Sequence, residues 1–256
     1  MKIRILSDLH IDQNPKFELK NKNVFTIIAG DISKDYKLTT KWIQENIKEG
    51  LFIEGNHAFT DKGPSLQEVY KNLQKNFPLN EDVSFLQNTY KEIDGKIFVG
   101  ATLWTDFKLG YYYTFNKKDL SYRPLNSYIR GNIIKDDKLK KMTMEDTIKE
   151  FHRSIAYIDY ICRKFPDKEI IVITHHCPSM LCSAERFRNN ILNPALISYL
   201  EPFIQEHSNI KAWICGHCHR EPLNINLGHC QLLMNPRGYT KYNECPKFNE
   251  DFVVEL

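Results

Sequence analysis

Five short apolar segments of this chain each lead into a cluster of aspartate, asparagine or histidine, and this pattern restricts the fold more than any other feature. The apolar segments are 3–6, 24–29, 51–53, 170–173 and 212–215. Runs of this length, rich in isoleucine, valine and phenylalanine, are typical of buried strands. The clusters that follow are Ser7-Asp8-Leu9-His10, Gly30-Asp31, Gly55-Asn56-His57, Thr174-His175-His176 and Gly216-His217-Cys218-His219. Because the carboxyl ends of strands in α/β proteins meet at one crevice, we expect these polar side chains to converge.

The segments between the clusters predict a chain in which strands alternate with helices. Helices are expected at about 38–50, 65–77, 143–163 and 194–207, and further strands at 231–234 and 252–256. Asp94-Gly95 lies between two strand-like segments and is a strong hairpin signal. The order implies one α/β domain over 1–256, with a mixed sheet or two packed sheets between helices.

An insert rich in aromatic and basic residues interrupts this pattern at about 104–142. Its aromatic residues include Trp104, Phe107 and Tyr111, and its cations include Lys108 and Arg123. Aromatic rings mixed with cations can stack a base and attract phosphate, so the insert is a candidate lid that selects the substrate. The sequence slightly favours the competing interpretation, a loop that folds over the sheets with its own small core.

Charge, cysteine content and hydropathy exclude several classes of protein. A net charge of +3 argues against obligatory electrostatic wrapping of nucleic acid. Seven cysteines, an odd number, favour reduced thiols in a cytosolic protein over a disulfide scaffold. Asp8 comes too early for a secretory apolar segment, and no apolar run approaches the ~20 residues that span a bilayer. We therefore expect a cytoplasmic protein with no membrane partner.

Each polar cluster, taken alone, has a structural explanation. Asp31 after a buried strand is suited to cap a helix, and Asn56 in a Gly-Asn pair is suited to a turn. A lone histidine after a strand is more often hydrogen-bonded than a ligand. His217 and His219, two residues apart after a glycine, form the most specific chelating pair. Five strand ends that supply only these residue types are nevertheless hard to explain by folding alone.

The donor set indicates two metal ions. With His57 left out and one histidine counted at 175/176, it contains two aspartates, one asparagine and four histidines, too many for one tetrahedral ion. Mixed nitrogen and oxygen donors without thiolate favour manganese, with iron or zinc as alternatives, over magnesium or calcium. Two ions roughly 3.5–4 Å apart that share a carboxylate and a hydroxide are suited to in-line attack on phosphorus.

The order of the five clusters resembles the calcineurin-like metallophosphoesterase superfamily. Two further stretches, 100–104 and 235–239, resemble small bacterial and phage members. The resemblance implies a four-layer αββα double β-sandwich flanked by helices, with a dimetal site at one edge. It implies a phosphomono- or phosphodiesterase that uses a metal-bridging hydroxide. A small phosphorylated substrate fits this activity; a nucleotide, another organic phosphate or nucleic acid are the candidates.

The resemblance also implies roles for individual residues. One ion would be held by Asp8, His10, Asp31 and His219, and the other by Asp31, Asn56, His175 and His217. His175 is preferred to His176 because the ligand in the family is the first imidazole after that strand. Asp31 would bridge the two ions, and His57 would protonate the leaving oxygen. Further candidate substrate contacts are Asn56, His176 and Arg237.

Two features of the sequence leave alternatives open. The family often has a carboxylate after Gly-Asn-His, where this chain has Ala58; a metal-containing but inactive module that binds a nucleotide or partner is therefore the second hypothesis. Cys215 and Cys218 resemble half of a zinc finger, and a zinc-dependent nucleic-acid module is the third. No second pair at finger spacing is evident in the sequence, which weakens this last hypothesis.

Overall fold

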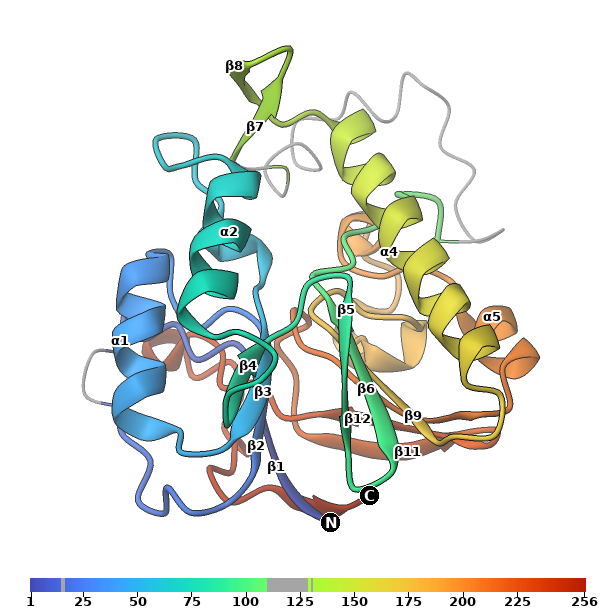
Figure 1. Ribbon diagram of the computed structural model, residues 1–256. Coiled ribbons are helices and arrows are strands. Elements are labelled where there is room, and N and C mark those ends of the chain that lie inside the picture. Colours follow the sequence, from blue (N-terminus) through green and yellow to red (C-terminus); the bar gives the residue numbers. More distant parts are fainter. Residues whose placement is uncertain (15–16, 110–128, 130) are drawn as a thin grey trace.

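Two β-sheets pack face to face, and helices cover both outer faces (Figure 1). The computed structural model describes residues 1–14, 17–109, 129 and 131–256. The first sheet contains, in spatial order, β13 (Val253–Glu255), β1 (Lys2–Leu6), β2 (Thr26–Ala29), β3 (Gly50–Ile53) and β4 (Val83–Phe85). Strands β1 to β4 are parallel, and β13 pairs antiparallel with β1. The parallel strands therefore end at the same edge.

The second sheet has a parallel centre and antiparallel edges. Its strands are β11 (Leu223–Leu227), β12 (Cys230–Met234), β10 (Ile210–Ile214), β9 (Ile170–Thr174), β6 (Lys96–Ala101) and β5 (Thr89–Ile93). Strands β12, β10, β9 and β6 run parallel to their neighbours in this group. The predicted hairpin joins β5 to β6, and Asp94 and Gly95 both have positive φ, 49° and 78°, as its tight turn requires.

The space between the sheets is filled by side chains from alternate strand positions. Ile3 and Ile5 of β1, and Ile173 of β9, are 0% exposed and belong to this core. Residues two apart in a strand lie on the same face, so their neighbours face outward. Phe52 and Val172 accordingly belong to the second core, beneath the helices.

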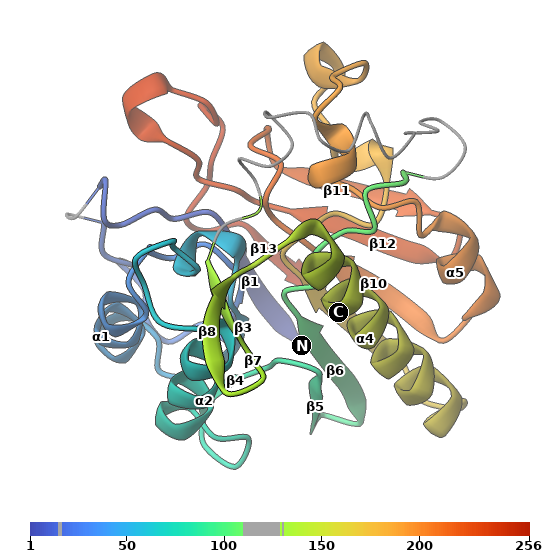
Figure 2. The ribbon, with the colours of Figure 1, turned by 90° about the horizontal axis from the view of Figure 1, so that it is seen from above.

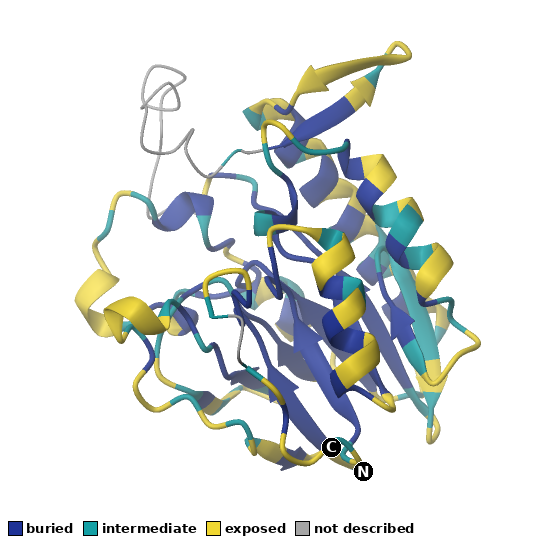
Figure 3. Ribbon diagram, turned by 90° about the vertical axis from the view of Figure 1, so that its left-hand side faces the viewer, coloured by how far each residue is buried: buried dark blue, intermediate teal, exposed yellow. Residues whose placement is uncertain are grey.

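Helices α1 (Tyr36–Asn46) and α2 (Leu66–Asn76) lie on the side of the first sheet, and α4 (Met144–Lys164) and α5 (Glu201–Glu206) on that of the second (Figure 2). Their outward-facing residues are exposed and their inward-facing residues buried (Figure 3). Ser65 caps α2, and Thr143 and Asp146 form a capping box on α4. The architecture is the expected α/β double sandwich between helices, in four layers.

Short 3-10 helices and a small hairpin complete the described residues. The 3-10 helices are η1 (Asn56–Ala58), η4 (Met180–Cys182), η5 (Glu185–Phe187), η6 (Asn193–Ala195) and η7 (Thr240–Tyr242). The helix expected over 194–207 is wrong in extent, because Ile197 instead forms a strand-like bridge with Cys177 before α5 begins. Among the described residues, no helix combines the length and apolar character needed to cross a membrane.

Part of the aromatic insert lies outside the described residues, namely 110–128 and 130. The rest contains the antiparallel strands β7 (Asn132–Lys135) and β8 (Lys138–Lys141). Phe107 is buried in a small cluster with Ala195, Leu192 and residues near the start of α4. Trp104, Leu109, Ile133 and Met142 belong to the main core beneath the helices, so the described part of the insert packs on the body of the protein and has no separate core.

Candidate metal centre

The five polar clusters converge on one edge of the two sheets. The Asp8 N–H donates to the Gly30 carbonyl at 3.0 Å, and the Gly216 N–H donates to the His175 carbonyl at 3.0 Å. Four residues of the clusters adopt the left-handed conformation: Asp8, His10, Asp31 and His217, with φ of 52°, 45°, 54° and 65°. Aspartate and histidine are among the residues that tolerate this conformation best, and here it turns the backbone sharply after each strand.

The first donor group consists of Asp8, His10 and His219, whose candidate ligand atoms lie within 4.8 Å of one another. Nε2 of His219 is 3.2 Å from Nε2 of His10 and 3.3 Å from Oδ1 of Asp8. Nδ1 of His219 donates to Oε2 of Glu244 at 2.5 Å. In a neutral His219 the proton is therefore on Nδ1, and the lone pair on Nε2 faces a carboxylate and a second imidazole.

The second donor group contains Asp31, His175 and His217, again within 4.8 Å, together with Asn56. Nδ1 of His175 donates to the Ala29 carbonyl at 2.9 Å. Its Nε2 lies 3.2 Å from Oδ2 of Asp31, 3.0 Å from Oδ1 of Asn56 and 3.1 Å from Nδ1 of His217. Neutral His175 thus presents a lone pair to two oxygens.

Both arrangements fit a bound cation. Lone pairs and carboxylates at about 3 Å repel one another unless a positive charge lies among them. Protons can supply that charge: burial alone would lower the pKa of His175, but Asp31 raises it to about 9. Burial would also lower the pKa of His219, but its contacts with Asp8 and Glu244 outweigh burial and raise this pKa to about 10. A divalent ion in each group would replace these protons, and buried oxygen and imidazole donors suit such an ion.

Asp31 lies between the two groups. Its Oδ1 accepts the His57 N–H at 2.9 Å, while its Oδ2 faces His175. His10, Asp31 and His57 form a third cluster of potential ligand atoms. The alternative role of Asp31 as a helix cap is wrong, because Asp35 caps α1. A Cβ on Gly55 would lie 2.0 Å from Oδ1 of Asp31, so only glycine allows this approach.

His57 faces the donor groups from η1. Its Nε2 is 3.2 Å from the hydroxyl of Tyr239 and 3.8 Å from Oδ2 of Asp31. Its buried Nδ1 has no hydrogen-bond partner among the described residues, and the residue that follows it, Ala58, has no polar side chain to offer. Asp61 does not substitute, since its carboxylate engages Lys141 and the backbone of the hairpin region.

Two predicted substrate contacts, His176 and Arg237, do not line the pocket over the donor groups, although the His176 ring packs 4.3 Å from that of His217. Nδ1 of His176 bonds to the Thr102 carbonyl at 3.1 Å, its ring stacks on Trp104, and burial lowers its pKa to about 3. The guanidinium of Arg237 lies 4.1 Å from the centre of the Phe17 ring and borders a separate cavity. Arg237 is thus outside the pocket described next.

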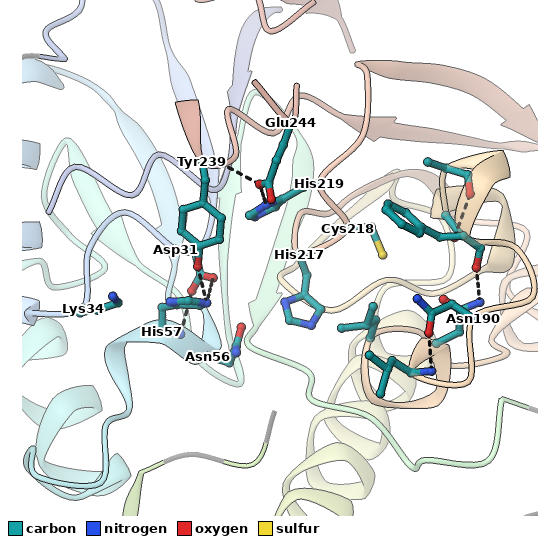
Figure 4. Close-up of a pocket in the computed structure, with 16 residues that line it drawn as sticks. Asp31, Lys34, Asn56, His57, Asn190, His217, Cys218, His219, Tyr239 and Glu244 are labelled. Atoms are coloured by element: carbon teal, nitrogen blue, oxygen red, sulfur yellow. Dashed lines mark hydrogen bonds and ion pairs between the residues drawn. The ribbon is translucent and has the colours of Figure 1, made fainter. Parts of the chain in front are cut away.

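A pocket of about 440 Å³ opens over the donor groups (Figure 4). Asp31, Asn56, His57, His217 and His219 line one side. The other side comes from residues 183–196, which include Asn190 and apolar side chains. Lys34, Cys218, Tyr239 and Glu244 complete the lining. Cavities of this volume accept small organic molecules.

Sequence reasoning missed Glu244 and gave Tyr239 no role. Glu244 accepts bonds from His219 and from the Tyr239 N–H at 3.0 Å, and the Tyr239 ring stacks on His10. Tyr239 belongs to the 235–239 stretch that already resembled relatives. Glu244 lies in an irregular segment, 25 residues from its partner, and no local pattern marks it.

The fold and these donor groups define a class of protein: a double β-sandwich with clusters of potential metal ligands at the ends of its parallel strands. The chain belongs to the calcineurin-like phosphoesterase family, whose sequence profile matches residues 1–221. The match contains every predicted metal ligand.

Two individual proteins are similar over nearly the whole chain. The uncharacterized protein L509 of Acanthamoeba polyphaga mimivirus is 26% identical over 286 residues, which covers 99% of this chain and 96% of that protein. A solved structure of phosphopantetheinyl hydrolase from Mycobacterium tuberculosis superposes with a TM-score of 0.71 at 12% identity, covering 100% of this chain and 95% of that chain. The second likeness supports the fold.

Proposed function

We propose that this protein hydrolyses a small phosphoester, such as a nucleotide or another organic phosphate, at a centre of two divalent metal ions. The observation that carries the proposal is the pair of donor groups, with Asp31 between them, beneath a 440 Å³ pocket. Membership of a phosphoesterase family supplies the reaction class.

Seven residues of the chain are the proposed ligands of the two ions. Asp8, His10 and His219 would hold one ion and Asn56, His175 and His217 the other, with Asp31 shared; manganese suits these donors, and iron and zinc are the alternatives. When bound, the ions supply a hydroxide nucleophile near neutral pH and positive charge for the phosphoryl oxygens.

His57 is the proposed general acid. Its Nε2 faces the pocket beside Asp31, where an imidazole N–H can donate a proton to a leaving oxygen. Tyr239, rather than a carboxylate, orients the ring through the contact between its hydroxyl and Nε2. When the substrate oxygen takes the proton from Nε2, the tyrosine hydroxyl can donate to the nitrogen left behind.

Lys34 and Asn190 are the proposed contacts for the rest of the substrate. Both line the pocket, on opposite sides (Figure 4), and a lysine ammonium attracts phosphate. Lys34 is 3.6 Å from a carboxylate oxygen of Asp12, and a substrate anion would compete for this cation.

The test is hydrolysis of a chromogenic phosphomonoester and phosphodiester by the purified protein with Mn(II). We expect metal-dependent turnover that Asp31→Asn abolishes and that Asp167→Asn, a change of an exposed aspartate, leaves intact. A panel of nucleotides, cyclic nucleotides, oligonucleotides and sugar phosphates then defines the substrate. Two bound ions without turnover of any ester would refute the proposal and favour the binding module.

A further inference from the structure

Four buried cysteines gather beside the metal centre and take no part in it. Cys177 follows the histidines of β9, Cys182 ends η4, and Cys215 and Cys218 flank His217. The sulfurs of the first three lie within 4.8 Å of one another, and those of Cys182 and Cys215 are 3.6 Å apart. All three are 0% exposed.

Cys218 supplies the fourth thiol. Its side chain interacts with that of Cys177, is 8% exposed and lines the pocket (Figure 4). Its sulfur lies outside the group of three that are within 4.8 Å of one another, so zinc binding would have to draw it closer. The cluster therefore consists of two pairs, Cys177-x4-Cys182 and Cys215-x2-Cys218. Both spacings fall in the range of zinc-binding cysteine pairs. The two pairs are separated by more residues than in a zinc finger, and the fold, not a finger motif, brings them together.

The separation between the sulfurs of Cys182 and Cys215 is that of two thiols in contact, is compatible with a shared metal ion, and is too long for a disulfide. Zinc binds thiolates at about 2.3 Å in a tetrahedron, so neighbouring sulfurs are about 3.8 Å apart. The Cys182–Cys215 separation of 3.6 Å is close to this value. A disulfide would need about 2.05 Å and would use only two of the four thiols.

We propose that Cys177, Cys182, Cys215 and Cys218 bind one structural zinc ion, separate from the two ions of the hydrolytic centre. Binding releases four thiol protons and leaves a site with a net charge of roughly −2. Arg220 is placed to offset it: its guanidinium donates to the carbonyls of Leu181 and Ser183, on either side of Cys182, at 2.6 and 3.2 Å.

The site would join the loops that carry three of the hydrolytic ligands. Cys177 is two residues from His175, and Cys215 and Cys218 enclose His217 and adjoin His219. The Cys177 thiol already donates to the Gly216 carbonyl at 3.0 Å. A zinc ion would fix these loops relative to η4, which borders the pocket at Ser183.

X-ray absorption at the zinc edge tests the assignment on the intact protein. None of the proposed hydrolytic ligands is a cysteine, so sulfur neighbours at about 2.3 Å report the thiolate site alone. We expect such a sulfur shell, and an intense thiolate-to-metal charge-transfer band after cobalt replaces the zinc. Zinc surrounded only by nitrogen and oxygen would overturn the proposal, whether or not the protein hydrolyses esters.

Metal content of two variants provides the matched comparison. Cys182→Ser should lose about one zinc per chain, whereas Cys162→Ser, which alters a buried cysteine of α4 outside the cluster, should lose none. If Cys182→Ser does not fold, the spectra of the intact protein still decide. Thiol titration after denaturation with a chelator should find all seven thiols. Five thiols would mean a disulfide and would overturn the proposal.

Discussion

Replacing Glu244 tests whether a carboxylate outside the proposed ligand set controls the affinity of the metal centre. Oε2 of Glu244 accepts from Nδ1 of His219 at 2.5 Å and from the Tyr239 N–H at 3.0 Å. Loss of such a partner of a ligating histidine typically weakens metal binding by about 10- to 100-fold, or about 1.4–2.7 kcal/mol. Glu244→Gln keeps an acceptor oxygen but loses the charge, so we expect about tenfold; Glu244→Ala loses both, so we expect about hundredfold.

Competition with a chelator measures these changes as the dissociation constant of Mn(II). Glu206→Gln is the control, because that glutamate forms an exposed ion pair with Arg163 far from the centre and should leave the constant unchanged. If both Glu244 variants bound Mn(II) within about twofold of the wild type, Glu244 would not orient His219. If glutamine and alanine weakened binding equally, the charge alone would matter and the hydrogen bonds would not.

Three further predictions address the centre and the fold. Gly55→Ala should displace the carboxylate of Asp31, because an oxygen of that carboxylate would lie 2.0 Å from the new Cβ. We expect turnover to fall by about 100-fold and the metal content to fall as well. His57→Ala should slow hydrolysis by about 10²-fold or more for poor leaving groups and less for good ones; equal losses would remove His57 from general-acid catalysis. Burial would raise the pKa of Asp146, but hydrogen bonds from Lys135 and Thr143 outweigh burial and lower it. The ionised carboxylate therefore stabilises the folded state at pH values above about 3.9, the pKa of aspartate in the unfolded chain. Asp146→Asn should therefore cost about 1 kcal/mol in denaturant unfolding at neutral pH, a difference that disappears as the pH falls through the folded pKa.

Gly95→Ala is the control for Gly55→Ala. Alanine at position 95 would also be strained, because the backbone there has a φ of 78°, but the added Cβ would contact no atom within 4 Å. The variant should lose about 1 kcal/mol of stability and keep full turnover well below its melting temperature. Equal loss of turnover in both variants would show that general destabilisation explains the effect of Gly55→Ala.

Local sequence signals predicted most of the fold because burial and capping act over a few residues. The predicted strand over 2–6 matches β1, and Ser65 and Thr143 start helices as their hydrogen-bonding side chains require. The extent of α5 was not predictable in this way. A bridge between Cys177 and Ile197, which lie 20 residues apart, interrupts the helical pattern there.

The clusters that hold the predicted metal ligands could be recognised in the sequence because each cluster follows a strand of its own. Contacts between segments that meet only after the sheets assemble have no comparable local pattern in the sequence. Glu244 reaches His219 from an irregular loop, and Cys182 reaches Cys215 across 33 residues of chain. Arg237 illustrates the converse: its guanidinium, which matches phosphate in shape and charge, made it a candidate phosphate ligand, while the fold places this group on Phe17.

The pairing of His10 with His219 has a consequence for the order of assembly. These residues are 209 positions apart, and closing a flexible loop of that length costs about 5 kcal/mol in chain entropy. An ion binding to the unfolded chain would find only the local pairs near residues 8–10 and 217–219, which is too little to recover that entropy. The two proposed hydrolytic ions would therefore bind only after the segment bearing His219 has joined the second sheet. Because they would bind the folded chain and not the unfolded one, their supply would set both how much of the protein is active and how far its folded state is stabilised.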